Sequence, residues 1–311
     1  MRALLVVNPK ATTTNERTRD VLVRALRSEA DLEVAVTRRR GHATQLTRQG
    51  AKDGVDVIVT LGGDGTINEA VNGLMGEPGT VLGPASSRPA LAVVPGGSTN
   101  VFARALGLPK DPLESTGVIL EGLREQRYRT IGLGLADDRY FTFCAGFGLD
   151  AAVIRGVERA RLRGRTSTPT LYFREALYQY ALAARHQPSI TVERPGEDPE
   201  TDLATAIVQN GAPWTYVGER PVDASPNASF DKGLDLLAFR SLRTPRSAWT
   251  GLRMLGRRGA SHGQHVLHRH DLSEFTLTAT HPQPFHVDGD YLGERQKVRF
   301  ISVPESLRVI C

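Results

Sequence analysis

The chain has few cysteines and no long apolar run, which are the features of disulfide-stabilised and of membrane-spanning proteins. It holds only two cysteines, Cys144 and Cys311, among 311 residues, which excludes a disulfide framework and fits a reducing compartment. No stretch approaches the roughly 20 consecutive apolar residues of a membrane-spanning helix. The N-terminus, MRALLVVNPK, has too short an apolar run for a signal peptide and lacks a small-residue cleavage site. We therefore expect a cytoplasmic protein whose membrane contacts, if any, are peripheral.

The residues that are present indicate a globular protein with anionic partners. Hydrophobic residues make up 40% of the sequence, which is enough for a core. A length of 311 residues suggests two domains, with one large domain as the alternative. The formal net charge of +5 favours nucleotides, anionic lipids or nucleic acid as partners. The sequence contains no nucleic-acid-binding motif, so we expect no partner of that class.

Short apolar runs alternate with helical patterns over the first third of the chain, which predicts a parallel sheet with helical crossovers. The expected strands are 3–8, 32–37, 55–61 and 91–95, and the expected helices are 41–54, 66–75 and 97–106. An earlier helix, capped by Thr14 or Asn15, would bury a face made of Val21, Leu22, Ala25 and Leu26.

The pattern changes beyond residue 130. Strand-like runs separated by turns predict a β-rich, mostly antiparallel second domain, which a helix at 170–186 interrupts. The predicted fold class is therefore α/β: a parallel-sheet nucleotide-binding domain at 1–130, rejoined by 295–311, and a β-rich domain at 131–294. The expected strands of the second domain are 131–135, 139–148, 189–194, 203–210, 234–241, 274–280 and 285–290.

Three glycines surround Asp64 in LGGDGTINEAVNGL, directly after a predicted buried strand. Ligands bind at this edge of open parallel sheets. Gly62, Gly63 and Gly65 would let the backbone approach a ligand and adopt positive φ angles, and the following helix directs its N–H groups to the same place. A carboxylate among phosphates is most often explained by Mg²⁺. The alternative is an ordinary strand-to-helix turn with Asp64 as a helix cap.

A second loop of the same design favours the ligand-binding interpretation. VVPGGSTNVFAR places Gly96, Gly97 and Ser98 after another buried strand and before another helix. Two such loops on one sheet predict a nucleotide cradle. The Gly-Lys-Ser/Thr ending of a Walker A loop is missing, and so is GxGxxG, so neither of these motifs describes the site.

At these residues the chain resembles the diacylglycerol kinase catalytic-domain family, which includes bacterial lipid kinases, sphingosine kinases and ceramide kinases. The similar segments are GGDGTINEAVNGL, PGGSTNVFARALGLP, GFGLDA at 146–151 and VDGD at 287–290. NAD kinases share GGDG but do not usually continue with Asn-Glu. The resemblance implies an α/β nucleotide-binding domain, a β-rich domain and an active site in the cleft between them.

The resemblance also implies roles for single residues. Asp64 would organise Mg²⁺, and Asp290 would act as the general base where the family usually has Glu; Asp288 is the competing base. The implied substrates are ATP and a lipid hydroxyl, with phosphoryl transfer achieved mainly by positioning and charge neutralisation. The implied nucleotide-binding residues are Asn8, Pro9, Thr37, Gly62, Gly63, Asp64, Gly65, Thr66, Asn68, Glu69, Gly96, Gly97 and Ser98.

The chain departs from the family pattern at three places. Val101 and Gly132 stand where many members have Asp. Asp64 therefore has fewer neighbouring carboxylates with which to bind a metal ion. Lys232 stands between Asp231 and Asp235 where bacterial members often have a structural Mg²⁺ site, and a lysine cannot be a ligand. We therefore expect that structural site to be missing, and a non-catalytic nucleotide- or lipid-binding protein of the same fold is the first alternative. An NAD kinase-like enzyme is the second.

Three basic stretches, one aromatic segment and a group of histidines also stand out in the sequence. The basic stretch 17–27 is best explained as a solvated helix face, whereas 155–165 and 251–259 could dock on an anionic membrane, the latter through Arg253, Arg257 and Arg258. The segment 214–226 is expected to be a loop, and a homodimer is left open. Four histidines are more typical of a strand–loop surface than of a metal site, namely His262, His265, His268 and His270.

Overall fold

The computed structural model describes residues 1–12, 16–77, 79–80, 83–165, 168–254 and 263–311. These residues form two compact units. The N-terminal unit comprises Met1–Leu133, Asp138–Thr142 and Pro304–Cys311. The C-terminal unit comprises Gly134–Asp137 and Phe143–Val303. The division of the chain into functional domains at 130 and 294 stays a prediction.

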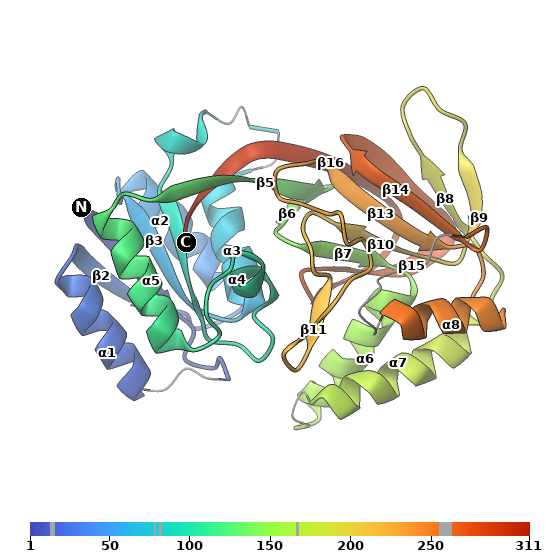
Figure 1. Cartoon of the computed structure of the whole chain (residues 1–311), viewed down its shortest axis with the longest axis horizontal. Helices are drawn as coiled ribbons and strands as arrows, with labels where there is room; N and C mark the ends of the chain where they lie inside the picture. The colour runs from blue at the N-terminus through green and yellow to red at the C-terminus, as the bar shows by residue number, and fades with distance from the viewer. Residues whose placement is uncertain (13–15, 78, 81–82, 166–167, 255–262) are drawn as a thin grey trace. The chain divides into compact units, whose positions relative to one another are not determined.

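The N-terminal unit is built on a parallel sheet, as predicted (Figure 1). Its strand order is β2 (Asp31–Val36), β1 (Arg2–Val7), β3 (Val57–Gly62) and β4 (Ala90–Pro95), followed by the end of β16 (Asp290–Ile310). Every residue of β3 and β4 is buried, because helices cover both faces of a sheet made of crossovers.

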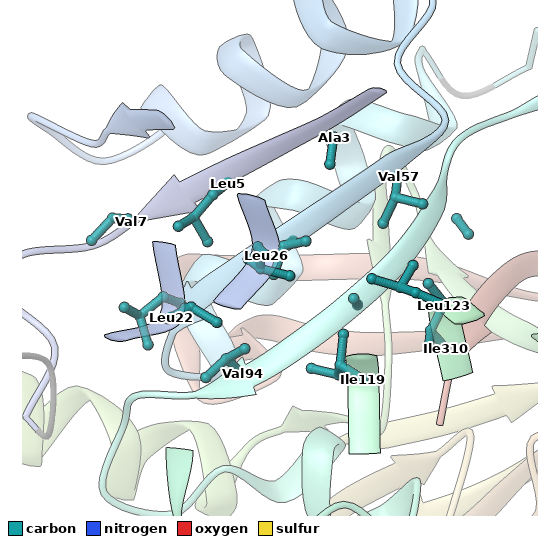
Figure 2. Packing of buried hydrophobic residues seen from close by; sticks show 14 residues of the cluster. Ala3, Leu5, Val7, Leu22, Leu26, Val57, Val94, Ile119, Leu123 and Ile310 are labelled. Carbon is teal, nitrogen blue, oxygen red and sulfur yellow. The ribbon is translucent and has the colours of Figure 1, made fainter. Parts of the chain in front are cut away.

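One face of this sheet packs against α1 (Glu16–Arg27) and α5 (Pro112–Arg124). Figure 2 shows Leu22 and Leu26 of α1 and Ile119 and Leu123 of α5 gathered with strand residues in one apolar cluster. Leu22 and Leu26 were expected to be buried and are, but Val21 is exposed, so that part of the predicted face is wrong. The proposed caps Thr14 and Asn15 lie outside the described residues.

The other face packs against α2 (His42–Lys52), whose neighbour is α3 (Asp64–Met75). A Cβ atom on Gly50 of α2 would lie 2.8 Å from Leu4 and 3.3 Å from Ile58. These two strand residues alternate with those facing α1 and α5, which places α2 on the opposite face. A Cβ atom on Gly73 of α3 would lie 1.8 Å from the Thr47 hydroxyl oxygen, so the two helices touch at a glycine.

Helix α4 (Val101–Ala105) is shorter than predicted. The expected helix at 97–106 begins only at Val101, because Asn100 adopts a left-handed conformation with φ +52°. The Asn100 side chain accepts a hydrogen bond from the Gly97 N–H and donates one to the Gly97 carbonyl, both at 2.8 Å. Residues 97–100 therefore form a closed turn ahead of the helix.

The C-terminal unit is dominated by antiparallel strands, which confirms the predicted class (Figure 1). The long hairpin of β15 (Glu274–Val287) and β16 carries the turn at residues 288–289. Strands β8 (Ile190–Glu193) and β9 (Glu200–Leu203) extend from β15. The remaining strands of the order β14-β13-β10-β7-β15-β16 are β14 (Val266–Leu272), β13 (Leu234–Phe239), β10 (Thr205–Gln209) and β7 (Cys144–Phe147).

Three helices accompany these strands: α6 (Leu149–Leu162), α7 (Pro169–Ala183) and α8 (Pro245–Met254). Only α7 was predicted as a helix, because the arginines of the other two obscure their apolar periodicity. The segment expected to be a loop at 214–226 contains a small hairpin of β11 (Thr215–Val217) and β12 (Arg220–Val222). Strand β6 (Arg139–Phe141) and the 3₁₀ turn at Ala85–Ser87 belong to the N-terminal unit; β6 pairs with β5 (Tyr128–Ala136).

Candidate functional site

Three loops meet at the carboxyl edge of the N-terminal sheet. They follow β1, β3 and β4, which are adjacent parallel strands. The Asn8 side chain donates a hydrogen bond to the Thr66 hydroxyl oxygen at 3.0 Å, which ties the first loop to the second. The Gly96 N–H donates to the Gly62 carbonyl oxygen at 2.7 Å, which ties the second loop to the third. The structure thus brings together the loops that the sequence singled out.

The two glycine loops touch backbone to backbone. A Cβ atom on Gly97 would lie 2.7 Å from the Gly63 Cα, and one on Gly63 would lie 3.2 Å from the Gly97 Cα. A Cβ atom on Gly62 would meet the Thr66 side chain at 2.7 Å. The expectation that these glycines adopt positive φ is wrong: Gly63 has φ −89°, and the positive angle in this region belongs to Asn100. Gly63 and Gly97 lack a Cβ atom and therefore let the two glycine loops approach each other closely.

Asp64 connects the two glycine loops. Its Oδ2 atom accepts a hydrogen bond from the Val101 N–H and its Oδ1 atom accepts one from the Phe102 N–H, both at 3.1 Å. Asp64 therefore caps the start of α4, whereas its own helix α3 is preceded by Gly63. Val101, where many family members have Asp, contributes its backbone N–H here and buries its side chain.

Asn68 and Glu69 face the interior of the N-terminal unit. The Asn68 amide is fully buried, accepting from the Arg139 guanidinium and donating to the Tyr140 carbonyl oxygen, both at 2.9 Å. The Glu69 carboxylate accepts from the N–H groups of Gly41 at 2.7 Å and Ala43 at 3.1 Å, at the start of α2. Their contact with a ligand stays a prediction, and it would require some of these hydrogen bonds to open.

The outer rim of the three loops is exposed and basic. Ser98 and Pro9 are exposed, and Thr37 is half-buried with its N–H bonded to the Val7 carbonyl oxygen at 2.8 Å. Gly65 is half-buried in the first turn of α3, where helix N–H groups and the positive end of the helix dipole favour anions. Exposed cations follow β1 and β2, namely Lys10, Arg38, Arg39 and Arg40.

The C-terminal unit contains an Asp-Gly-Asp turn between β15 and β16. Asp288 is only 4% exposed, and its Oδ1 atom accepts from the N–H groups of Phe143 at 3.0 Å and Cys144 at 3.1 Å. The turn itself needs left-handed conformations, with φ +47° at Asp288 and +78° at Gly289. Asp290 is half-buried at the start of β16. Asp288 thus closes the turn, and the assignment of the general base to Asp290 stays a prediction.

A histidine–aspartate pair beside this turn was not predicted. The His286 Nε2 atom lies 2.6 Å from Asp150 Oδ2, and the Gly289 N–H donates to His286 Nδ1 at 3.3 Å. In this arrangement Nδ1 accepts from the Gly289 backbone and Nε2 faces the Asp150 carboxylate. A Cβ atom on Gly146 would lie 2.4 Å from His286 Nε2, so only glycine leaves room for the pair. Asp150 lies in the segment GFGLDA, and His286 directly precedes the segment VDGD.

Lys232 contacts His270, which in turn contacts Asp235. Lys232 Nζ lies 3.3 Å from His270 Nε2, and His270 Nδ1 lies 2.6 Å from Oδ1 of the fully buried Asp235. His268 and His270 lie on β14, and His262 falls outside the described residues. Within the described ranges, no group of three or more His, Cys, Asp or Glu side chains is arranged to hold a metal ion.

Comparison with known proteins identifies the N-terminal part of the chain. Residues 2–134 match the diacylglycerol kinase catalytic domain. The match contains the three loops, Asp64 and the buried Asn68 and Glu69.

Curated relatives match over the same part of the chain. A diacylglycerol kinase from Bacillus subtilis (strain 168) is 41% identical over 109 residues, which are 35% of this chain and 32% of that protein. A protein named as a lipid kinase, YegS-like, from Chromohalobacter salexigens is 35% identical over 149 residues, 48% of this chain and 44% of that protein. The aligned residues therefore span less than half of these relatives.

Solved structures share the fold of the whole chain. A diacylglycerol kinase from Bacillus anthracis str. Sterne superposes with a TM-score of 0.72 at 23% identity, covering 99% of this chain and 96% of that one. An NAD kinase from Archaeoglobus fulgidus, solved in complex with ATP, has a TM-score of 0.50 at 12% identity, covering 100% of this chain and 94% of that one. No helix in the described ranges has the length and apolar character needed to cross a membrane.

Proposed function

We propose that the protein is an ATP-dependent lipid kinase that transfers the γ-phosphate to a lipid hydroxyl, with diacylglycerol as the first substrate to test and phosphatidic acid as its product. The observation that carries the proposal is the pair of glycine loops joined by Asp64, within residues that match the diacylglycerol kinase catalytic domain. The names of the relatives from Bacillus subtilis and Chromohalobacter salexigens support the same class.

The nucleotide is proposed to lie along the rim of the three loops. Phosphates would face the first turn of α3 at Gly65 and the loop at Gly97 and Ser98, where backbone N–H groups can serve as donors. The exposed cations Lys10 and Arg38 would offset the charge of the triphosphate. Asn8 and Thr66, which bond to one another, would fix the spacing of the two loops. The ATP in the NAD kinase structure supports this choice of nucleotide by fold alone.

Asp64 is also the proposed contact for Mg²⁺. Each of its carboxylate oxygens accepts a backbone N–H hydrogen bond, and a carboxylate oxygen can have more than one partner. A single carboxylate suits Mg²⁺, which keeps several waters and binds through one or two carboxylates and the substrate phosphates. The bound ion would neutralise charge on the phosphates. Asp64 itself would hold the two glycine loops at a fixed distance for that contact.

Asp290 is proposed as the general base. Its carboxylate would accept the proton of the lipid hydroxyl as that oxygen bonds to the γ-phosphorus and the bond to the departing ADP oxygen breaks. Asp288 and the His286–Asp150 pair hold the turn from which Asp290 projects. The lipid is proposed to bind in the C-terminal unit, in a cytoplasmic protein that visits the membrane surface.

The test is transfer of labelled γ-phosphate from ATP to a total lipid extract dispersed in detergent, with NAD in a parallel tube. We expect a labelled lipid that depends on Mg²⁺ and disappears in Asp290→Asn, since loss of a general base typically costs 10²–10⁴-fold in rate. Asp198→Asn, an exposed carboxylate on the loop after β8, is the matched control. ATP binding by Asp290→Asn should equal that of the unaltered protein.

Three other outcomes would contradict parts of this proposal. Labelled NAD without labelled lipid would indicate an NAD kinase-like enzyme. ATP binding without any transfer would indicate a non-catalytic binding protein, and Val101 and Gly132 would then be the first residues to restore to Asp. Full lipid phosphorylation by Asp290→Asn would remove the general-base assignment while leaving the kinase.

A further inference from the structure

Three helices of the C-terminal unit carry large hydrophobic side chains on their solvent side. On α7, Phe173, Leu177 and Tyr178 are 54–58% exposed, and on α8 Trp249 is 63% and Leu252 58% exposed. Leu162, at the end of α6, is 84% exposed. Single exposed apolar residues are ordinary, but a contiguous group on adjacent elements marks an interaction surface.

The exposed residues follow helical spacing. Phe173 and Leu177 are four residues apart on α7, and Tyr178 follows Arg174 at the same spacing, so these four side chains share one face. Other residues of α7 pack into the unit, among them Leu171, Tyr180 and Ala183. A surface helix normally has a polar outer face, whereas α7 is apolar on both sides.

Helix α8 repeats the pattern with more charge. Arg246, Trp249 and Leu252 follow one another at intervals of three, and all three are exposed, whereas Ser247, Thr250 and Met254 are buried. Trp and Leu beside Arg are typical of helices that lie in the interfacial region of a bilayer.

The three helices are neighbours. Tyr180 of α7 and Met254 of α8 pack in one apolar cluster, and the Tyr180 hydroxyl donates to the Leu242 carbonyl oxygen at 2.7 Å. Helices α6 and α7 share a second cluster, which contains Val157 and Leu171. Figure 1 shows α6, α7 and α8 grouped along one border of the C-terminal unit.

The surroundings of these side chains are strongly basic. Residues 159–185 contain six arginines and one acidic residue, Glu175, which pairs with Arg174 at 3.8 Å. Residues 243–254 contain three arginines and no acidic residue. The charge of this region is therefore positive and opposes contact with another positive surface.

We propose that this helical face docks the protein on an anionic lipid bilayer. We define the helical face by the six exposed hydrophobic residues Leu162, Phe173, Leu177, Tyr178, Trp249 and Leu252 with the arginines beside them. The aromatic and aliphatic side chains enter the headgroup region while the arginines contact lipid phosphates. A second copy of the chain fits less well, because a two-fold contact would oppose two faces of the same positive charge.

The docking surface deepens the proposed function, in which the protein visits the membrane surface, and it rests on that part of the proposal. Its test needs no phosphoryl transfer. The sequence indicated the basic stretches 155–165 and 251–259 as membrane contacts, but not α7, which supplies three of the six hydrophobic side chains. Arg257 and Arg258 lie outside the described residues, so the surface is argued without them.

The first test is co-sedimentation of the full chain, without nucleotide, with vesicles of phosphatidylcholine alone or with about one third phosphatidylglycerol. We expect binding to the anionic vesicles and at least about tenfold less to the neutral ones, because each arginine near an anionic surface strengthens binding severalfold. Binding in the absence of ATP separates this result from the proposed kinase activity: a failure here leaves lipid phosphorylation in detergent unaffected.

Paired variants assign the contact to the helical face. Trp249→Ser with Leu252→Ser should lower vesicle binding about tenfold or more, because two apolar side chains no longer enter the interface. The matched control is Leu113→Ser, which removes an exposed leucine of α5 in the N-terminal unit. Arg246→Glu with Arg253→Glu should lower binding to anionic vesicles at least as much, and Arg17→Glu with Lys52→Glu is the control with equal change in charge.

Tryptophan fluorescence gives an independent reading. In a Trp214→Phe variant the emission comes from Trp249 alone, since the chain has two tryptophans. We expect a blue shift with anionic vesicles and none with phosphatidylcholine. Equal vesicle binding by both members of each variant pair would overturn the proposal. A dimer in analytical ultracentrifugation that Trp249→Ser with Leu252→Ser dissociates, with no vesicle binding by the unaltered protein, would assign the helical face to self-association instead.

Discussion

Two aspartates, one in each unit, each accept hydrogen bonds from two consecutive backbone N–H groups, but they differ in burial. Asp64 accepts two consecutive backbone N–H groups, one on each carboxylate oxygen, and stays half-buried at a rim. Asp288 accepts two consecutive N–H groups on a single oxygen and is almost fully buried. A half-buried carboxylate that holds backbone N–H groups can also contact a ligand. A fully buried one can only stabilise the turn, here the turn that carries Asp290. We therefore propose ligand contact for Asp64 and Asp290 and a purely structural role for Asp288.

The largest expected effect is that of Asp64→Ala on activity. This change removes the proposed Mg²⁺ contact and the cap of α4 together, and we expect lipid phosphorylation to fall by more than about a hundredfold. Mg²⁺-dependent ATP binding, measured by calorimetry, should be lost as well. Asp64→Asn keeps one acceptor oxygen. If this variant retained full activity, the role of Asp64 would be purely structural, like that of Asp288.

Asp288→Ala should have the largest effect on stability. Two buried N–H groups of Phe143 and Cys144 would lose their acceptor, which costs about 2–4 kcal/mol in the free energy of unfolding. Chemical denaturation measures this loss, with Asp198→Ala as an exposed control. ATP binding should be unchanged at a temperature where the variant is folded. A loss below about 0.5 kcal/mol would show that the turn does not depend on this carboxylate.

Gly97→Ala should have a smaller effect, confined to the N-terminal unit. The added methyl group would meet the Gly63 Cα at 2.7 Å and push the two glycine loops apart. We expect ATP affinity to fall about tenfold, with about 1–3 kcal/mol lost in stability from overpacking. Gly79→Ala is a control, because no atom lies within 4 Å of the added Cβ, although its positive φ adds a modest strain. Unchanged ATP affinity in Gly97→Ala would separate the loop contact from nucleotide binding.

The sequence predicted more of the N-terminal unit than of the C-terminal unit. The fully apolar strands β3 and β4 and the amphipathic α1 were identified, because a parallel sheet with crossovers leaves strong local periodicity. Helices α6 and α8 were missed, since their many arginines and the small number of buried residues weaken the helical pattern. Helix α4 was predicted too long, because the left-handed Asn100 depends on its own bonds to Gly97.

The sequence by itself determined the match of residues 2–134 to the diacylglycerol kinase catalytic domain, the two fold classes and the position of the glycine loops, because these depend on local composition and on spacing along the chain. Only the tertiary structure decided that the glycines provide space for one another, that Asp64 caps a helix 37 residues away, and that His286 meets Asp150. These contacts join segments far apart in the chain, and no local pattern encodes which of them will meet. The exposed apolar side of α7 was decided in the same way, since only packing shows which apolar side chains of this helix are left uncovered.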